Sequence, residues 1–404
     1  MYPQELIDEI VDYLHDSPSA LKACSLVSRK FYPRTRVHLF REAGCDDPKS
    51  ARIFDIPRDS PELLQCIKHV ELRCLDFFLP EYQTATVDFL HSLTFPVTLS
   101  LWDDSERGDD IALVNYTKKE YVGWGSVLPM FLSSAPYGAI ARLELTSPRW
   151  NTFLEFHAIV LSLPNVTELH IVDLTEFDMV DGLVVPAPPA PRIKKIYVDV
   201  EGDDTIIFWE GLRLYRDVYL DHLEELHVVN PPPDDLWSVA QTANLASKDL
   251  RVLEIDCHSQ YAYLGPNTTP LDLNNIADLR FGVELSDDDD MLLFINWWIH
   301  SFKAVEKDSP IIEQVTIRLA DAIGPEQLEP LKRAFEELSD FLSKLVRNVD
   351  LVFQLQKYEA QPSPLTSRFR NTIVDACEVL KEKSNLRVFD IDEYTYEVPV
   401  FPIP

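Results

Sequence analysis

The chain has 404 residues with 37 basic against 67 acidic side chains, and its formal net charge of −30 disfavours nucleic acid and anionic membranes, since phosphate binding relies on clustered Lys and Arg. A hydrophobic content of 46% supports a full core and excludes a disordered chain. There is no CxxC pair, no apolar run of roughly 20 residues and no basic leader before Glu5, so we expect a cytoplasmic or nuclear protein.

Residues 1–42 differ from the rest in charge, because their basic and acidic residues balance and the remainder carries the whole −30. The apolar residues within 4–15 recur at three- and four-residue steps, which predicts an amphipathic helix. Ser17 and Pro18 offer a capping hydroxyl and a first-turn proline, so a second helix is expected to begin there. Pro33 fits the first turn of a third helix that reaches Phe40.

Two motifs in this segment resemble the F-box. Pro3-Gln4-Glu5-Leu6-Ile7 opens the first helix, and Leu26-Val27-Ser28-Arg29-Lys30-Phe31-Tyr32 follows at the spacing of that family's Val-Ser-Arg-x-Phe motif, although Tyr2 stands where the family has Leu. The resemblance implies an F-box-like helical domain over 1–45 that docks to a Skp-type adaptor and through it to a cullin. It implies that the following residues contact the adaptor or support that surface: Pro3, Glu5, Leu6, Ile10, Leu14, Leu21, Val27 and Phe31. The alternative is an ordinary helical cap on a repeat array.

The remainder, 46–404, repeats one pattern: an apolar residue, two others, an apolar residue, one other and an apolar residue. The copies end at Leu72, Leu101, Leu145, Ile171, Val198, Val228, Ile255, Phe281, Ile317, Leu351 and Ile391. Helix-like stretches separate them, at 152–163, 205–220, 234–245, 287–302, 326–345 and 365–381. This alternation predicts a parallel sheet with helices outside it.

The body resembles the leucine-rich repeats often attached to F-boxes, without the Asn that follows each strand in that family. The predicted fold is therefore α/β: an N-terminal three-helix F-box followed by an irregular leucine-rich-repeat-like solenoid, with parallel strands on the concave face. The interval of about 102–136 is too long for one repeat, and we interpret it as an insertion.

The residue between the last two apolar positions of each copy is expected to point away from the core, because side chains in a strand alternate faces. These residues form a column: Glu71, Ser100, Glu144, His170, Tyr197, His227, Glu254, Arg280, Thr316, Asp350 and Asp390. Aromatic and titratable groups gather in it, so we predict that a partner binds the concave face at His170, Tyr197, His227 and Glu254, together with Trp102. The alternative is that these are only exposed strand residues.

The sequence carries none of the usual catalytic motifs: no phosphate-binding glycine loop, GxSxG elbow, HExxH helix or cysteine in a catalytic context. We expect no enzymatic activity, no cofactor and no metal. A metal shared by His170 and His227 is not expected, because two strand spacings hold them about 10 Å apart.

Taken with the F-box resemblance, the sequence predicts a substrate-recognition subunit of an SCF-type cullin ubiquitin ligase, whose repeat body binds a protein target. The acidic body would steer a basic target towards it. The alternative is a leucine-rich-repeat-like scaffold or sensor that mediates protein–protein interaction without a ligase.

Overall fold

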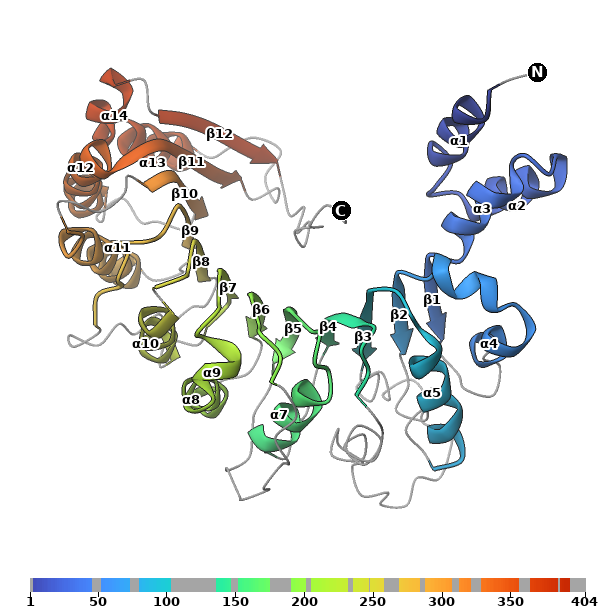
Figure 1. Cartoon of the computed structure of the whole chain (residues 1–404). Helices are drawn as coiled ribbons and strands as arrows, with labels where there is room; N and C mark the ends of the chain where they lie inside the picture. The colour runs from blue at the N-terminus through green and yellow to red at the C-terminus, as the bar shows by residue number, and fades with distance from the viewer. Residues whose placement is uncertain are drawn as a thin grey trace, which may run out of the picture. The chain divides into compact units, whose positions relative to one another are not determined.

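The computed structural model describes residues 3–45, 52–72, 80–102, 136–146, 152–174, 190–200, 205–231, 235–246, 248–257, 269–283, 288–306, 312–320, 328–355, 364–383 and 386–392. The predicted insertion lies almost wholly outside these residues. The chain divides into two compact units, Met1–Ile193 and Lys194–Pro404. Figure 1 labels the helices and strands of both units.

Three helices open the first unit, as predicted: α1 (Gln4–Asp12), α2 (Pro18–Val27) and α3 (Tyr32–Leu39). Ser17 caps α2, since its hydroxyl accepts a hydrogen bond from the Ala20 amide at 3.4 Å. Asp12 joins α1 to α3: it accepts hydrogen bonds from Arg34 at 2.5 and 2.8 Å and lies 2.7 Å from Nε2 of His38. The hydrogen bond from Arg34 lowers the pKa of Asp12 to about 2, so this link stays charged at neutral pH.

A parallel sheet follows in the first unit. Its strands are β1 (Glu42–Cys45), β2 (His69–Leu72), β3 (Val97–Trp102), β4 (Ile140–Thr146) and β5 (Glu168–Leu174), each paired with the next in chain order. Between them lie η1 (Arg52–Asp55), α4 (Ile56–Asp59), η2 (Pro61–Cys66), α5 (Pro80–Ser92) and α7 (Phe153–Leu161). Strand β1 was not predicted, because Glu-Ala-Gly-Cys has no repeat pattern, and the sheet therefore begins at Glu42.

The second unit continues the alternation with strands β6 (Lys195–Val200), β7 (Glu225–Val229), β8 (Val252–Cys257), β9 (Asp278–Val283), β10 (Ile312–Ala320), β11 (Val346–Leu355) and β12 (Leu386–Asp392). These strands also pair in parallel and in chain order. The helices are α8 (Ile206–Leu214), α9 (Arg216–Tyr219), α10 (Leu236–Ala246), α11 (Asp288–Lys303), α12 (Leu328–Leu345), α13 (Pro364–Ala376) and α14 (Glu378–Glu382). The predicted α/β solenoid-like architecture is confirmed.

The core of each unit consists of the apolar positions of the repeat pattern and the helices that cover them. Leu223, Leu226 and Val228, for example, are completely buried in and beside β7. Large helix side chains fill the space above the strands, as where the Trp298 ring stacks on Phe281 with ring centroids 4.5 Å apart. None of the helices in the described ranges is both long and apolar enough to cross a bilayer.

The predicted alignment of the last strand is wrong. Strand β12 pairs with β11 so that Leu386 lies beside Val349, three residues away from the alignment that the repeat pattern suggests. An odd shift turns a strand over. Arg387 therefore takes the outward position beside Asp350, and Asp390 aligns with Phe353, a core residue of β11.

If the repeat pattern supplies the core, Leu226→Ala should lower the free energy of unfolding by about 2–5 kcal/mol, because it leaves a cavity beneath β7. Leu214→Ala is the matched control, since Leu214 is 67% exposed on α8, and should change the value by less than about 0.5 kcal/mol. Urea denaturation of the full chain measures both, and equal effects would contradict the predicted core.

Candidate functional site

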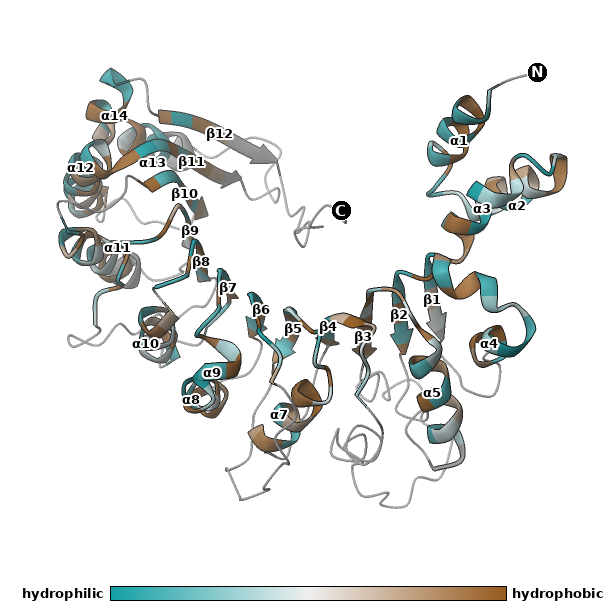
Figure 2. Ribbon diagram, viewed as in Figure 1, coloured by the Kyte–Doolittle hydropathy of each residue, from teal (hydrophilic) through white to brown (hydrophobic). Residues whose placement is uncertain are grey.

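The apolar stripe of α1 has a buried half and an exposed half. Ile7 and Val11 pack inside the helical segment, whereas Leu6 and Ile10 are 46% and 52% exposed. In Figure 2, α1 accordingly carries both hydrophobic and hydrophilic turns. The C-terminal end of α2 exposes two further apolar side chains, Leu26 and Val27. These four residues are called the exposed helical residues below.

The predicted adaptor residues fall into three groups. Pro3, Glu5, Leu6, Ile10 and Val27 are exposed, Leu14 and Phe31 are half-buried, and Leu21 is buried. Most of the set is therefore accessible to a partner, while Leu21 can act only by supporting the packing of α2. Sequence reasoning missed Leu26 and Tyr13, which are both exposed apolar residues of the same helical segment.

In the first unit, the outward sides of β3, β4 and β5 carry a connected set of polar side chains. Glu144 accepts a hydrogen bond from the Ser100 hydroxyl and forms an ion pair with Arg142 at 2.8 Å. Nδ1 of His170 lies 3.8 Å from the Glu144 carboxylate. Arg142 also lies 3.1 Å from Nδ1 of His170. Burial alone would raise the pKa of Glu144, but the hydrogen bonds from His170 and Ser100 and the Arg142 charge lower it to about 2.

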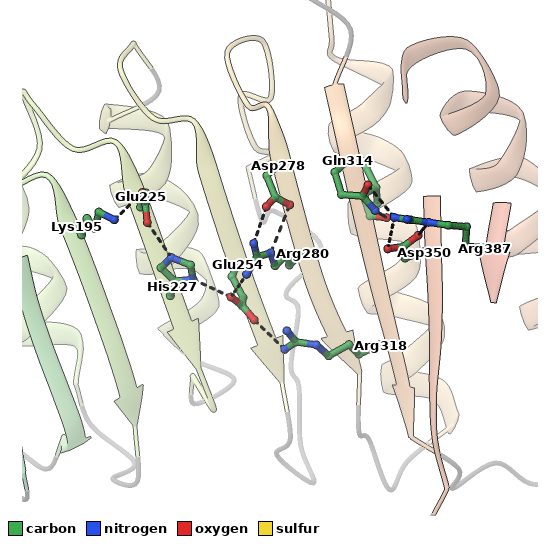
Figure 3. A network of polar contacts seen from close by, with 11 residues as sticks. Lys195, Glu225, His227, Glu254, Asp278, Arg280, Gln314, Arg318, Asp350 and Arg387 are labelled. Carbon is green, nitrogen blue, oxygen red and sulfur yellow. Dashed lines mark hydrogen bonds and ion pairs between the residues drawn. The ribbon is translucent and has the colours of Figure 1, made fainter. Parts of the chain in front are cut away.

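In the second unit, the strand register brings Tyr197, His227 and Glu254 side by side on β6, β7 and β8, as predicted. Their rings and charges interact: the Tyr197 and His227 centroids are 6.4 Å apart, and Nδ1 of His227 donates to Glu254 at 2.7 Å. Glu225 lies 3.7 Å from the other nitrogen of His227 and 3.0 Å from Lys195 (Figure 3).

Two arginines extend this set across β9 and β10. Arg318 lies 2.8 Å from Glu254, and Arg280 lies 3.6 Å from Glu254 and 2.6 Å from Asp278 (Figure 3). Arg318 also lies 2.5 Å from Asp256. We call the whole set the β6–β10 charge network; its members are Lys195, Glu225, His227, Glu254, Asp256, Asp278, Arg280 and Arg318. The network combines acids and bases on neighbouring strands, so each buried charge meets an opposite one.

The contact between Arg318 of β10 and Asp256 of β8, which spans two strands, depends on the glycine at position 282. Gly282 of β9 lies between Asp256 of β8 and Arg318 of β10 in the register. A Cβ atom built on Gly282 would overlap the carboxylate of Asp256. The missing side chain thus lets Arg318 reach over one strand to Asp256 on the next.

The protonation states follow from these contacts. Burial would raise the pKa of Glu254, yet the His227 hydrogen bond and the arginine charges outweigh it and lower that pKa to about 2. Burial would lower the pKa of His227, yet the Glu225 and Glu254 carboxylates outweigh it and raise that pKa above its ordinary value. At neutral pH Glu254 is therefore ionised and lies against the cationic Arg280 and Arg318.

The structure changes the picture of the predicted partner-binding residues. His170, His227 and Glu254 lie on the outward side of the strands as predicted, but each is buried and engaged with neighbouring charges. Tyr197 and Trp102 are half-buried. Trp102 and His170 belong to the first unit, whereas the β6–β10 charge network belongs to the second. Arg280 belongs to the predicted outward column, and the register pairs Gly282 of β9 with Arg318 of β10 at the next outward position. None of these three was among the predicted partner-binding residues.

No family profile and no curated protein sequence matches the chain significantly. The resemblance to the F-box therefore rests on the motifs of the N-terminal helices alone. Within the ranges that the structure describes, no group of three or more His, Cys, Asp and Glu side chains could hold a metal ion.

Gly282→Ala should displace the Asp256 carboxylate and lower the free energy of unfolding by about 1–3 kcal/mol, the usual cost of overpacking. Gly138→Ala is the control, because the nearest atom to a Cβ there is 3.7 Å away. Urea denaturation of both variants tests the close approach, and a Gly282→Ala variant as stable as its control would rule it out.

The raised pKa of His227 predicts a pH dependence of stability. Folding favours the protonated ring, so its contribution is complete below the ordinary pKa of 6.5 and is lost as the pH rises through the higher folded pKa. Unfolding measured from about pH 6 to about pH 9 should show the advantage of the wild type over His227→Gln shrinking with pH. The exposed His222 provides the control variant, His222→Gln. A constant advantage would refute the assignment.

Proposed function

We propose that the chain is the substrate-recognition subunit of an SCF-type cullin ubiquitin ligase, in which the N-terminal helices dock to a Skp-type adaptor and the repeat body holds a protein target. The observation that carries the proposal is the pair Leu6 and Ile10, exposed on α1 within an F-box-like motif. The chain contributes no catalytic residue in this role and instead positions a target near a ubiquitin-conjugating enzyme.

The exposed helical residues support a docking surface on energetic grounds. An apolar side chain left in water forgoes roughly 1.5–3 kcal/mol that burial would provide, so several on one short segment favour a partner that covers them. Ile7, Val11 and Leu21 already form the interior of the segment. The exposed ones are therefore available for a partner without any rearrangement of the helices.

The body supports a separate binding role through its alternating strands and helices. Repeat arrays present an extended surface built from equivalent positions of successive strands, and such surfaces are typical of protein recognition. A scaffold or sensor without a ligase would use the body in the same way, so the adaptor interaction separates the two functions.

Replacing Leu6 and Ile10 together by Asp should abolish co-purification with a Skp-type adaptor, because two carboxylates would be buried at the interface without partners. Both side chains are exposed, so the variant should unfold at the wild-type urea concentration. The matched control is Leu214→Asp on α8, also exposed, which should leave the adaptor bound. If the wild-type chain does not co-purify with the adaptor, the ligase proposal is contradicted and the scaffold function is favoured.

A further inference from the structure

We infer that the outward side of strands β6–β12 binds an acidic segment of a partner protein through exposed guanidinium groups. This inference rests on the proposed function only in that the body holds a protein target, and it names the chemistry of that target. It concerns residues of the second unit alone.

The cationic side chains of this face are more exposed to solvent than the acidic side chains that pair with them. The side chains of Arg280 and Arg318 are 33% and 30% exposed, whereas those of Glu254 and Asp256 are 7% and 5% exposed. The same order holds at β12, where Arg387 is 59% exposed and its partner Asp350 is 15% exposed. A molecule that approaches the strands therefore reaches these three arginines more readily than Glu254, Asp256 and Asp350, whereas Asp278, the other partner of Arg280, is 26% exposed.

The buried acids also hold the cations in place. Arg318 makes both of its ion pairs through Nη1, and within the described ranges its Nε and Nη2 donate to no residue. Arg387 is fixed by two hydrogen bonds to Asp350, at 2.7 and 2.8 Å. An arginine that is already oriented loses less side-chain entropy when a carboxylate binds to its open edge.

The outward position between Arg280 and Asp350 carries no charge. It is occupied by Thr316 of β10. Gln314 accepts a hydrogen bond from Arg387 at 3.4 Å (Figure 3). An extended peptide crossing from β9 to β12 would meet the guanidinium groups of Arg280 and Arg387, with Thr316 and the less exposed Asp350 between them.

This assignment reverses the expectation that the net charge of −30 selects a basic target. Net charge acts over long distances, and salt screens it beyond about 8 Å under physiological conditions. Contact chemistry is decided by the groups at the surface of the strands, and there Glu254, Asp256 and Asp350 are less exposed than the arginines that pair with them. Glu254 stays ionised beneath Arg280 and Arg318, because its pKa is about 2.

The test uses fluorescence anisotropy to measure how the full chain binds fluorescein-labelled peptides of repeating Glu-Gly-Ser or Lys-Gly-Ser units. The Glu peptide should bind and the Lys peptide should not, and added salt should weaken the complex. Arg280→Gln and Arg387→Gln should each lower the affinity roughly two- to fivefold, as expected for half-exposed ion pairs. The matched control is Arg216→Gln on α9, where Arg216 is 51% exposed and pairs with Asp221 at 2.6 Å, and it should bind like the wild type.

Stronger binding of the Lys peptide, or wild-type affinity of both arginine variants for the Glu peptide, would overturn the inference. Its failure is distinguishable from failure of the adaptor proposal. The Leu6→Asp, Ile10→Asp variant should keep wild-type affinity for the Glu peptide, and Arg387→Gln should keep the adaptor.

Discussion

Parallel stacking of short strands is the constraint from which the other features follow. Strands about 4.8 Å apart place every outward side chain next to the same position of its neighbours. The inward positions satisfy this constraint with apolar side chains such as Leu226 and Leu253, which are buried. Several outward positions satisfy it with charges of opposite sign, as where His227 lies beside Glu254 and Glu254 lies beside Arg280. A single face therefore acquires both its stability and its binding chemistry from one geometric rule.

The two surfaces of the chain differ in the kind of partner that each can take. The helical segment exposes Leu6, Ile10, Leu26 and Val27, so it favours a partner that brings apolar surface. The outward side of β6–β12 exposes the ends of cations, so it favours a partner that brings carboxylates. A chain with one surface of each kind can hold two proteins at once, which is the requirement for a recognition subunit and equally for a scaffold.

Sequence reasoning reached most of the fold, because periodicity directly reflects which side chains are buried. The three N-terminal helices and the strands from β2 to β11 lie where their patterns placed them. It failed where the cause lies in another part of the chain: β1 exists because β2 offers an edge to pair with, and the register of β12 is set by β11. For the candidate site, the column of residues was predictable, but their burial was not. Arg318 reaches Asp256 from two strands away, and no local pattern reports such a contact.

The central claim is that the outward charges act as one coupled network rather than as independent surface residues. A double-mutant cycle with Glu254→Gln and Arg318→Gln, followed by urea denaturation of the full chain, measures the coupling directly. The account predicts an interaction free energy of about 1–3 kcal/mol, as for neighbours in one buried network. Additivity of the two substitutions to within about 0.5 kcal/mol would contradict it.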